Sequence, residues 1–230
     1  MLERNASNEM FRNLALNISG QSTWQNQIRL LRIHQDGPDP PLWLGKGLML
    51  PYETYAETIT HSDPDQKYLF RILRRKDSRN FEGFLIHPVP DLYKFVFLRI
   101  QGIGHEFLTD AHGRIRGILP DIDFSKIHVV LNPPFAIFRT RSAEVGDVCE
   151  IGPDFAVADK SDIVIQMSFK RTSDKTILKV RVPEFELMRG NEKVVLIIDG
   201  ERAMISAPQS GASLFEEFGG SGELQVNLYE

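Results

Sequence analysis

The chain has 230 residues, of which 42% are hydrophobic and 25% are charged, a balance typical of a folded domain rather than of a disordered or membrane-embedded chain. Its net charge of -4 argues against broad electrostatic binding to nucleic acid or anionic lipid. The single cysteine excludes an intramolecular disulfide and a zinc site of several cysteines. We therefore expect a reducing, intracellular compartment, and no apolar run predicts a membrane span or a secretion signal.

The N-terminal segment, residues 1–26, carries apolar residues at helical spacing. Met10, Leu14 and Ile18 recur every four residues and Ser7 can cap the start, so the pattern predicts a short helix from about Ser7 to Asn17. The following stretch, 28–33, fits either a helix or a strand, and its alternation with arginine favours a strand. No cofactor is expected from the sequence as a whole.

Beyond the proline-rich loop at 36–41, short apolar segments recur with turn residues between them. This spacing predicts a mainly β fold, an antiparallel sandwich or barrel, rather than alternating βα units. We expect one β-rich domain over 27–230, which would divide, if at all, near 120–125. The predicted strands are Trp43–Leu50, Lys67–Leu73, Phe81–Ile86, Tyr93–Ile100, Glu106–Thr109, Arg114–Leu119, Ile127–Leu131, Ala136–Thr140, Ile163–Phe169, Ile177–Val182, Phe185–Met188, Val194–Ile198, Arg202–Ile205 and Leu224–Leu228.

The Asp-Gly dipeptide at 199–200 predicts a β-hairpin, because a type I′ turn needs positive φ at both central residues. A two-residue loop pairs Leu196 with Ala203 on one face and Val195 with Met204 on the other. Both faces are then apolar, so something must cover the second face. A helix, another sheet or another subunit could do so, and in the last case Val195, Ile197 and Met204 would form the interface.

The last predicted element is a short C-terminal helix. Ser213 can cap its start and the Gly-Gly pair at 219–220 can end it, which predicts one or two helical turns over Ser213–Phe218. The whole chain is thus expected to be β-rich with one short helix near each end.

Metal-ligand residue types gather on one predicted hairpin. Imidazole and carboxylate groups so close in sequence could hold zinc, manganese or iron, although a solvated hairpin also explains them. The candidate ligands are His105, Glu106, Asp110 and His112.

The densest basic cluster lies between two predicted strands and has aromatic neighbours. Arginine pairs with phosphate and aromatic rings stack on bases, so the cluster is a candidate nucleic-acid or acidic-partner patch, against the alternative of a solvated turn. It consists of Arg71, Arg74, Arg75, Lys76 and Arg79.

A predicted strand runs into Asn132-Pro133-Pro134-Phe135, and Asp121 and Asp123 stand upstream. This string resembles the motif of amino methyltransferases of the adenine-N6 type. The resemblance implies that Asn132 and Pro133 would hold an exocyclic amine and that Phe135 would stack on the base. It covers about ten residues, and the only glycine-rich candidate, Gly102-Ile103-Gly104, lies too close upstream for the family's βαβ elements.

These patterns favour a non-catalytic structural or adaptor subunit that acts through protein–protein contacts in an oligomer or larger assembly, of which a viral or phage structural protein is one example. Two enzyme classes are the alternatives: a metal-dependent enzyme with its site on the 105–112 hairpin, and the amino methyltransferase. Self-association or a protein partner is expected, nucleic acid only through the basic cluster, and no membrane.

Overall fold

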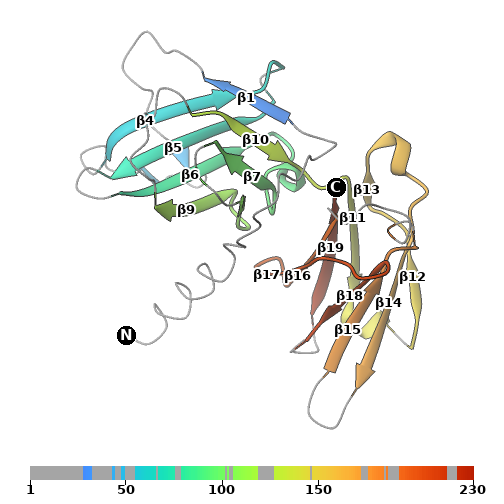
Figure 1. Cartoon of the computed structure of the whole chain (residues 1–230). Helices are drawn as coiled ribbons and strands as arrows, with labels where there is room; N and C mark the ends of the chain where they lie inside the picture. Colours follow the sequence, from blue (N-terminus) through green and yellow to red (C-terminus); the bar gives the residue numbers. More distant parts are fainter. Residues whose placement is uncertain are drawn as a thin grey trace, which may run out of the picture. The chain divides into compact units, whose positions relative to one another are not determined.

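The structure is a computed structural model, and it describes residues 28–32, 43–44, 48–49, 55–65, 67–75, 79–101, 103, 106–118, 127–145, 147–171, 176–183, 185, 192–216 and 222–230. The strands of these residues pair in antiparallel fashion, and helical structure among them is limited to short 3-10 turns (Figure 1). Contacts divide the chain into two compact units that take in Gln27–Leu131 and Asn132–Glu230. The division falls after residue 131, on the C-terminal side of the region 120–125.

Unit 1 is built on one eight-stranded antiparallel sheet. The order across the sheet is β8-β7-β10-β1-β4-β5-β6-β9. The bounds are β1 Ile28–Arg32, β4 Tyr55–Ser62, β5 Leu69–Arg75, β6 Asn80–Ile86, β7 Phe97–Ile100, β8 Glu106–Leu108, β9 Arg114–Ile118 and β10 Val129–Asn132. A separate pair joins β2 (Trp43–Leu44) to β3 (Leu48–Met49), and a 3-10 turn, η2, covers Pro90–Leu92.

The sheet of unit 1 curls around its own core. Phe81 on β6 meets Phe107 on β8 edge-to-face, with 5.6 Å between ring centroids, although six places separate these strands in the sheet order. Gly117 on β9 approaches both rings so closely that a Cβ would lie 2.6 Å from Phe81. The two ends of the sheet therefore approach each other, yet the described strands do not close into a barrel.

Unit 2 has two antiparallel sheets. The first, ordered β13-β11-β19-β16-β17, has five strands, and the second, ordered β12-β14-β15-β18, has four. The bounds are β11 Ala136–Arg141, β12 Cys149–Ile151, β13 Phe155–Ala156, β14 Ile165–Arg171, β15 Thr176–Arg181, β16 Lys193–Ile198, β17 Arg202–Ser206, β18 Ala212–Phe215 and β19 Glu223–Tyr229, with 3-10 turns η4 (Ser142–Glu144) and η5 (Ala158–Lys160).

The two sheets of unit 2 share one apolar core. Alternate residues of each strand point inward, so Phe138, Leu196 and Val226 of the five-stranded sheet join Met167 and Val180 of the four-stranded sheet in a single cluster. Each of these five side chains is at most 1% exposed. The sheets are therefore the two layers of one compact unit.

Two expectations about helices have different outcomes. The C-terminal helix over Ser213–Phe218 is wrong, because its first three residues lie in β18, where Ser213 pairs with Val180 and Leu214 with Lys179. The N-terminal helix over Ser7–Asn17 lies outside the described residues. In the part of the chain that the structure describes, no helix has the length and apolar character needed to cross a membrane.

The hairpin at 194–205 forms, but its register differs from the prediction. Asp199 and Gly200 have φ of 51° and 70°, and the Glu201 amide donates to the Ile198 carbonyl at 3.1 Å, as a type I′ turn requires. The ladder then begins one residue later, with Ile198 opposite Arg202 and Leu196 opposite Met204. Glu201 is an extra residue, so Met204 moves to the opposite face from Val195 and Ile197.

Candidate functional site

The predicted interface on the hairpin is not one surface. Met204 faces the core between the sheets of unit 2, whereas Val195 and Ile197 lie on the other face of the five-stranded sheet. Val195 and Ile197 are 0% exposed, so a protein partner has no access to them in this structure. The interface at Val195, Ile197 and Met204 stays a prediction, and the observed register divides its residues between two faces of the sheet.

Buried polar groups share that second face. Asn227 and Tyr229 on β19 are each 0% exposed, and the Asn227 amide donates to the Tyr229 hydroxyl at 3.1 Å. Burial raises the pKa of Tyr229 well above its usual value, while the hydrogen bond from Asn227 lowers it by less. These groups stabilise the packing of the sheet and are closed to solvent.

On the predicted metal hairpin, the described carboxylates are used for structure. Glu106 accepts a hydrogen bond from Arg99 Nη2 at 2.6 Å. Asp110 accepts from the main-chain amides of His112 and Arg114 at 2.8 and 2.9 Å, which fixes the turn. Among the described residues no three His, Cys, Asp or Glu side chains are placed to hold a metal ion. The metal site stays a prediction, because His105 lies outside them.

The predicted basic cluster does not form one patch. Arg71 pairs in register with Phe84 and is 6% exposed, while Arg74 lies three residues further along β5 and therefore on the opposite face. Arg75 lies at the end of β5 and Arg79 is exposed before β6. Lys76 is outside the described residues. A nucleic-acid or acidic-partner patch at this cluster stays a prediction.

The Asn-Pro-Pro-Phe string occupies the passage from unit 1 to unit 2. The Asn132 amide donates to the main-chain oxygen of Glu230 at 2.8 Å, and Pro133 follows the end of β10. Phe135 is 1% exposed and packs edge-to-face on Phe185, with 6.0 Å between centroids. The ring cannot stack on a base from this position. The described antiparallel sheets also differ from the parallel α/β fold that the resemblance implies.

A buried polar group at the β4–β5 turn has no counterpart in the sequence predictions. Asp63 accepts a hydrogen bond from the Tyr68 amide at 2.6 Å, and the Tyr68 ring lies against His87 with 4.5 Å between centroids. Burial, with a smaller contribution from Asp63, raises the pKa of Tyr68 to about 12. The His61 side chain, 0% exposed, contacts the Ile127 carbonyl through Nε2 at 3.1 Å. These contacts secure the turn, as the Ser-Asp-Pro-Asp sequence at 62–65 indicates.

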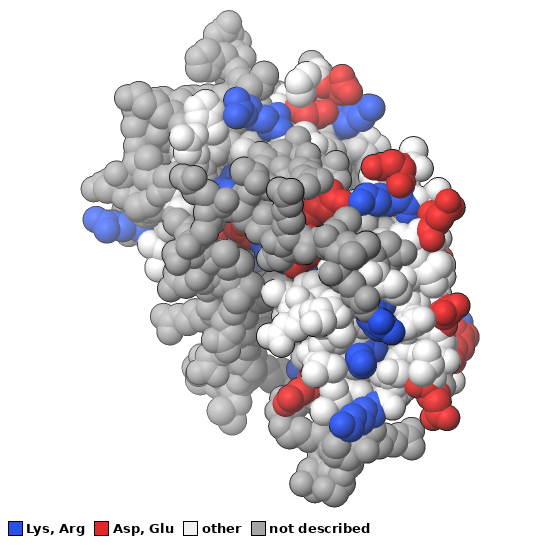
Figure 2. Space-filling model, turned by 45° about the vertical axis from the view of Figure 1, so that its right-hand side comes forward, with Lys and Arg blue, Asp and Glu red and all other residues white. Residues whose placement is uncertain are grey.

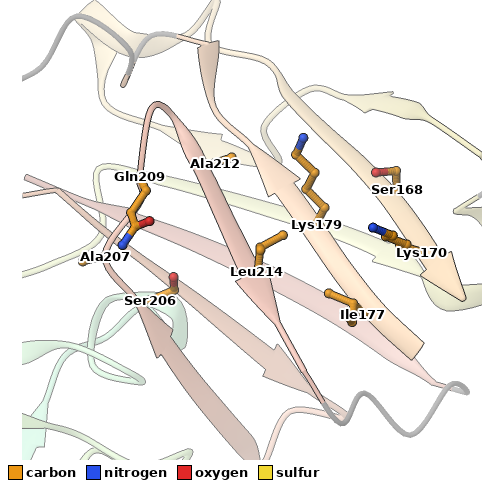
Figure 3. A pocket seen from close by; sticks show the side chains of 9 residues that line it. All are labelled: Ser168, Lys170, Ile177, Lys179, Ser206, Ala207, Gln209, Ala212 and Leu214. Atoms are coloured by element: carbon orange, nitrogen blue, oxygen red, sulfur yellow. The ribbon is translucent and has the colours of Figure 1, made fainter. Parts of the chain in front are cut away.

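A groove runs over the outer face of the four-stranded sheet of unit 2. Figure 3 shows Leu214 between Gln209 on one side and Ile177 and Lys179 on the other. Leu214 is 60% exposed and adjoins Ile177 and Ala212 in the lining of this groove. We call this surface the β14–β15–β18 groove, and it is lined by Ser168, Lys170, Ile177, Lys179, Ser206, Ala207, Gln209, Ala212 and Leu214.

The hairpin that follows β17 shapes one wall of the groove. Ser210 and Gly211 have φ of 49° and 71°, and Gln209 and Ala212 exchange main-chain hydrogen bonds of 2.8 and 3.0 Å. This is a second type I′ turn, so the Ser-Gly dipeptide is a tight turn and not a flexible connection. The sequence signal for the groove is the alternation of Leu178 and Val180 with Lys179 and Arg181, which leaves one wet face on β15.

Comparison of the chain with family models, with curated proteins and with solved structures finds no match.

Proposed function

We propose that this chain is a non-catalytic, β-rich structural or adaptor subunit that acts through protein–protein contacts in an oligomer or larger assembly, within a reducing, intracellular compartment. The observation that carries the proposal is the β14–β15–β18 groove, where Leu214 stands 60% exposed on a regular sheet face. Its lining combines the apolar residues Ile177, Ala212 and Leu214 with polar residues such as Lys170, Lys179 and Gln209. A neighbouring set of apolar side chains with polar groups around it is the composition expected of a contact surface.

Among the described residues, several polar side chains that could take part in catalysis have structural contacts instead. Asp110 and Glu106 hold arginines, and Asp63 fixes a turn. Asn132 binds the C-terminal residue and Phe135 is part of the core of unit 2. By contrast, both lysines in the groove are exposed on a rigid sheet, which suits recognition by contact.

Sedimentation of the purified chain over a concentration series tests the proposal. We expect masses above the 26.2 kDa of one chain, rising with concentration. Leu214→Asp should weaken this association without unfolding the protein, because the side chain is already 60% exposed. Val148→Asp is the matched control, since Val148 is 67% exposed in the same unit and lies outside the groove. A strict monomer at high concentration would contradict the proposed self-association.

A further inference from the structure

We infer that the β14–β15–β18 groove binds an acidic segment of a second copy of this chain, residues 154–162. This inference rests on the proposed function, because it names the partner of the same groove. Charge complementarity between two surfaces of unit 2 identifies the segment 154–162 as the partner of the groove.

The groove is positively charged although the whole chain has a net charge of -4. Lys170 and Lys179 are exposed on adjacent strands, since Lys170 pairs in register with Ile177 and Ser168 with Lys179. Figure 3 shows both lysines on the same side of Leu214. Figure 2, which brings the right-hand side of Figure 1 forward, shows basic side chains set in a mostly uncharged area with acidic side chains at its margin.

The acidic segment lies between β12 and β14. Asp154, Asp159 and Asp162 are all exposed, and the last two stand on either side of Lys160 around η5. Lys160 does not neutralise them, because its ammonium group pairs with the Glu230 carboxylate at 2.9 Å and lies over the Phe135 ring. The segment therefore presents carboxylates to a partner while its one cation is used internally.

The two surfaces belong to opposite ends of β14. The acidic segment precedes Ile165 at the start of the strand, and Lys170 is near its end, roughly 16 Å away at about 3.3 Å per residue. At this separation, residues 154–162 do not reach the groove of their own unit. Contact between different surfaces of two copies is heterologous, and such contacts build rings or filaments instead of closed dimers.

Charge reversal in both surfaces provides the test, with sedimentation velocity as the readout. The groove variant is Lys170→Glu with Lys179→Glu, and the segment variant is Asp159→Lys with Asp162→Lys. Each should weaken association on the order of a hundredfold, because like charges then face each other across the contact. An equimolar mixture of the two variants should associate again, and so should a chain that carries all four substitutions and keeps the net charge of -4.

The control is Arg139→Glu with Arg202→Glu, two exposed positions on the five-stranded sheet. It shifts the net charge from -4 to -8, as the groove variant does, but should leave association unchanged. Circular dichroism checks that each variant is folded. If the wild-type chain associates and neither reversal matters, this inference is overturned while the proposed function stands. If Leu214→Asp also leaves the wild-type association intact, or the chain is always monomeric, both fail.

Discussion

Substitution of Gly222 by alanine should destabilise unit 2 through the turn at Asp199. Gly222 has φ of +144°, a conformation that L side chains rarely adopt, and it lies directly before β19. A Cβ at this position would collide with the Asp199 carboxylate. That carboxylate accepts a hydrogen bond from the Glu223 amide at 3.0 Å, so it must move and lose this bond when alanine is present.

The expected cost has two parts. A non-glycine residue in this backbone conformation costs about 1–3 kcal/mol. Loss of a hydrogen bond to a charged acceptor at an exposed site adds about 1 kcal/mol. We therefore expect Gly222→Ala to lower the free energy of unfolding of unit 2 by roughly 2–4 kcal/mol. Gly200→Ala is the comparison, because φ there is +70° but nothing lies within 4 Å of the added Cβ, and only the backbone cost of about 1–2 kcal/mol remains.

Urea unfolding followed by far-UV circular dichroism measures these changes, and hydrogen exchange of β16 and β19 amides assigns the transition to unit 2. A double-mutant cycle with Asp199→Gly isolates the collision, since glycine removes the carboxylate and tolerates the positive φ. In that background Gly222→Ala should cost only its backbone part, which gives a coupling of about 1 kcal/mol. Strictly additive effects would refute the assigned role of the Asp199 carboxylate.

Two further predictions address burial. Val195→Lys should unfold unit 2, at a cost of at least about 3 kcal/mol, because it places an ammonium group where the side chain is 0% exposed. Val148→Lys is the control, since this position is 67% exposed and the change in stability should be less than about 0.5 kcal/mol. A folded Val195→Lys monomer that fails to associate would instead restore the hairpin interface. Tyr68 has a pKa of about 12 in the folded chain against 10 when unfolded, so the unfolded state loses this proton first as the pH rises. The free energy of unfolding should therefore fall between pH 10 and 12, by about 3 kcal/mol in total from this group. Urea unfolding at these pH values should show a shallower fall for Tyr68→Phe, and equal slopes would count against the raised pKa.

Strand content could be predicted from the sequence wherever apolar residues alternate clearly. The segments 177–182 and 224–228 alternate apolar with polar residues, and both form strands close to the expected bounds, although Asn227 on the polar face of the second strand is buried. The strand β4 (Tyr55–Ser62) could not be predicted from the apolar pattern, because Thr58, Thr60 and Ser62 give it little apolar character. It forms because it pairs along its whole length with β5, a tertiary effect that local pattern does not report.

The C-terminal helix failed for a related reason. Ser213 is a good cap and Glu216 suits a helical turn, so local propensity favours helix. Pairing with β15 prevails, since Phe215 then enters the core of unit 2 at 2% exposure while Leu214 points outward. Local sequence could not show this, because the residues that decide it are more than 30 positions away.

The proposed contact surface differs from the predicted one, and the first cause is the position of Glu201. With Glu201 counted in the loop, Met204 joins Leu196 towards the core and the hairpin no longer offers three apolar residues on one face. The groove that we propose as the contact surface lies on the other sheet, around Leu214, a residue that the sequence analysis placed in a helix. Two differences therefore explain why the contact surface is now placed on the four-stranded sheet. The turn is one residue longer than predicted, and a segment predicted as a helix is a strand. The charge-reversal experiment tests this surface.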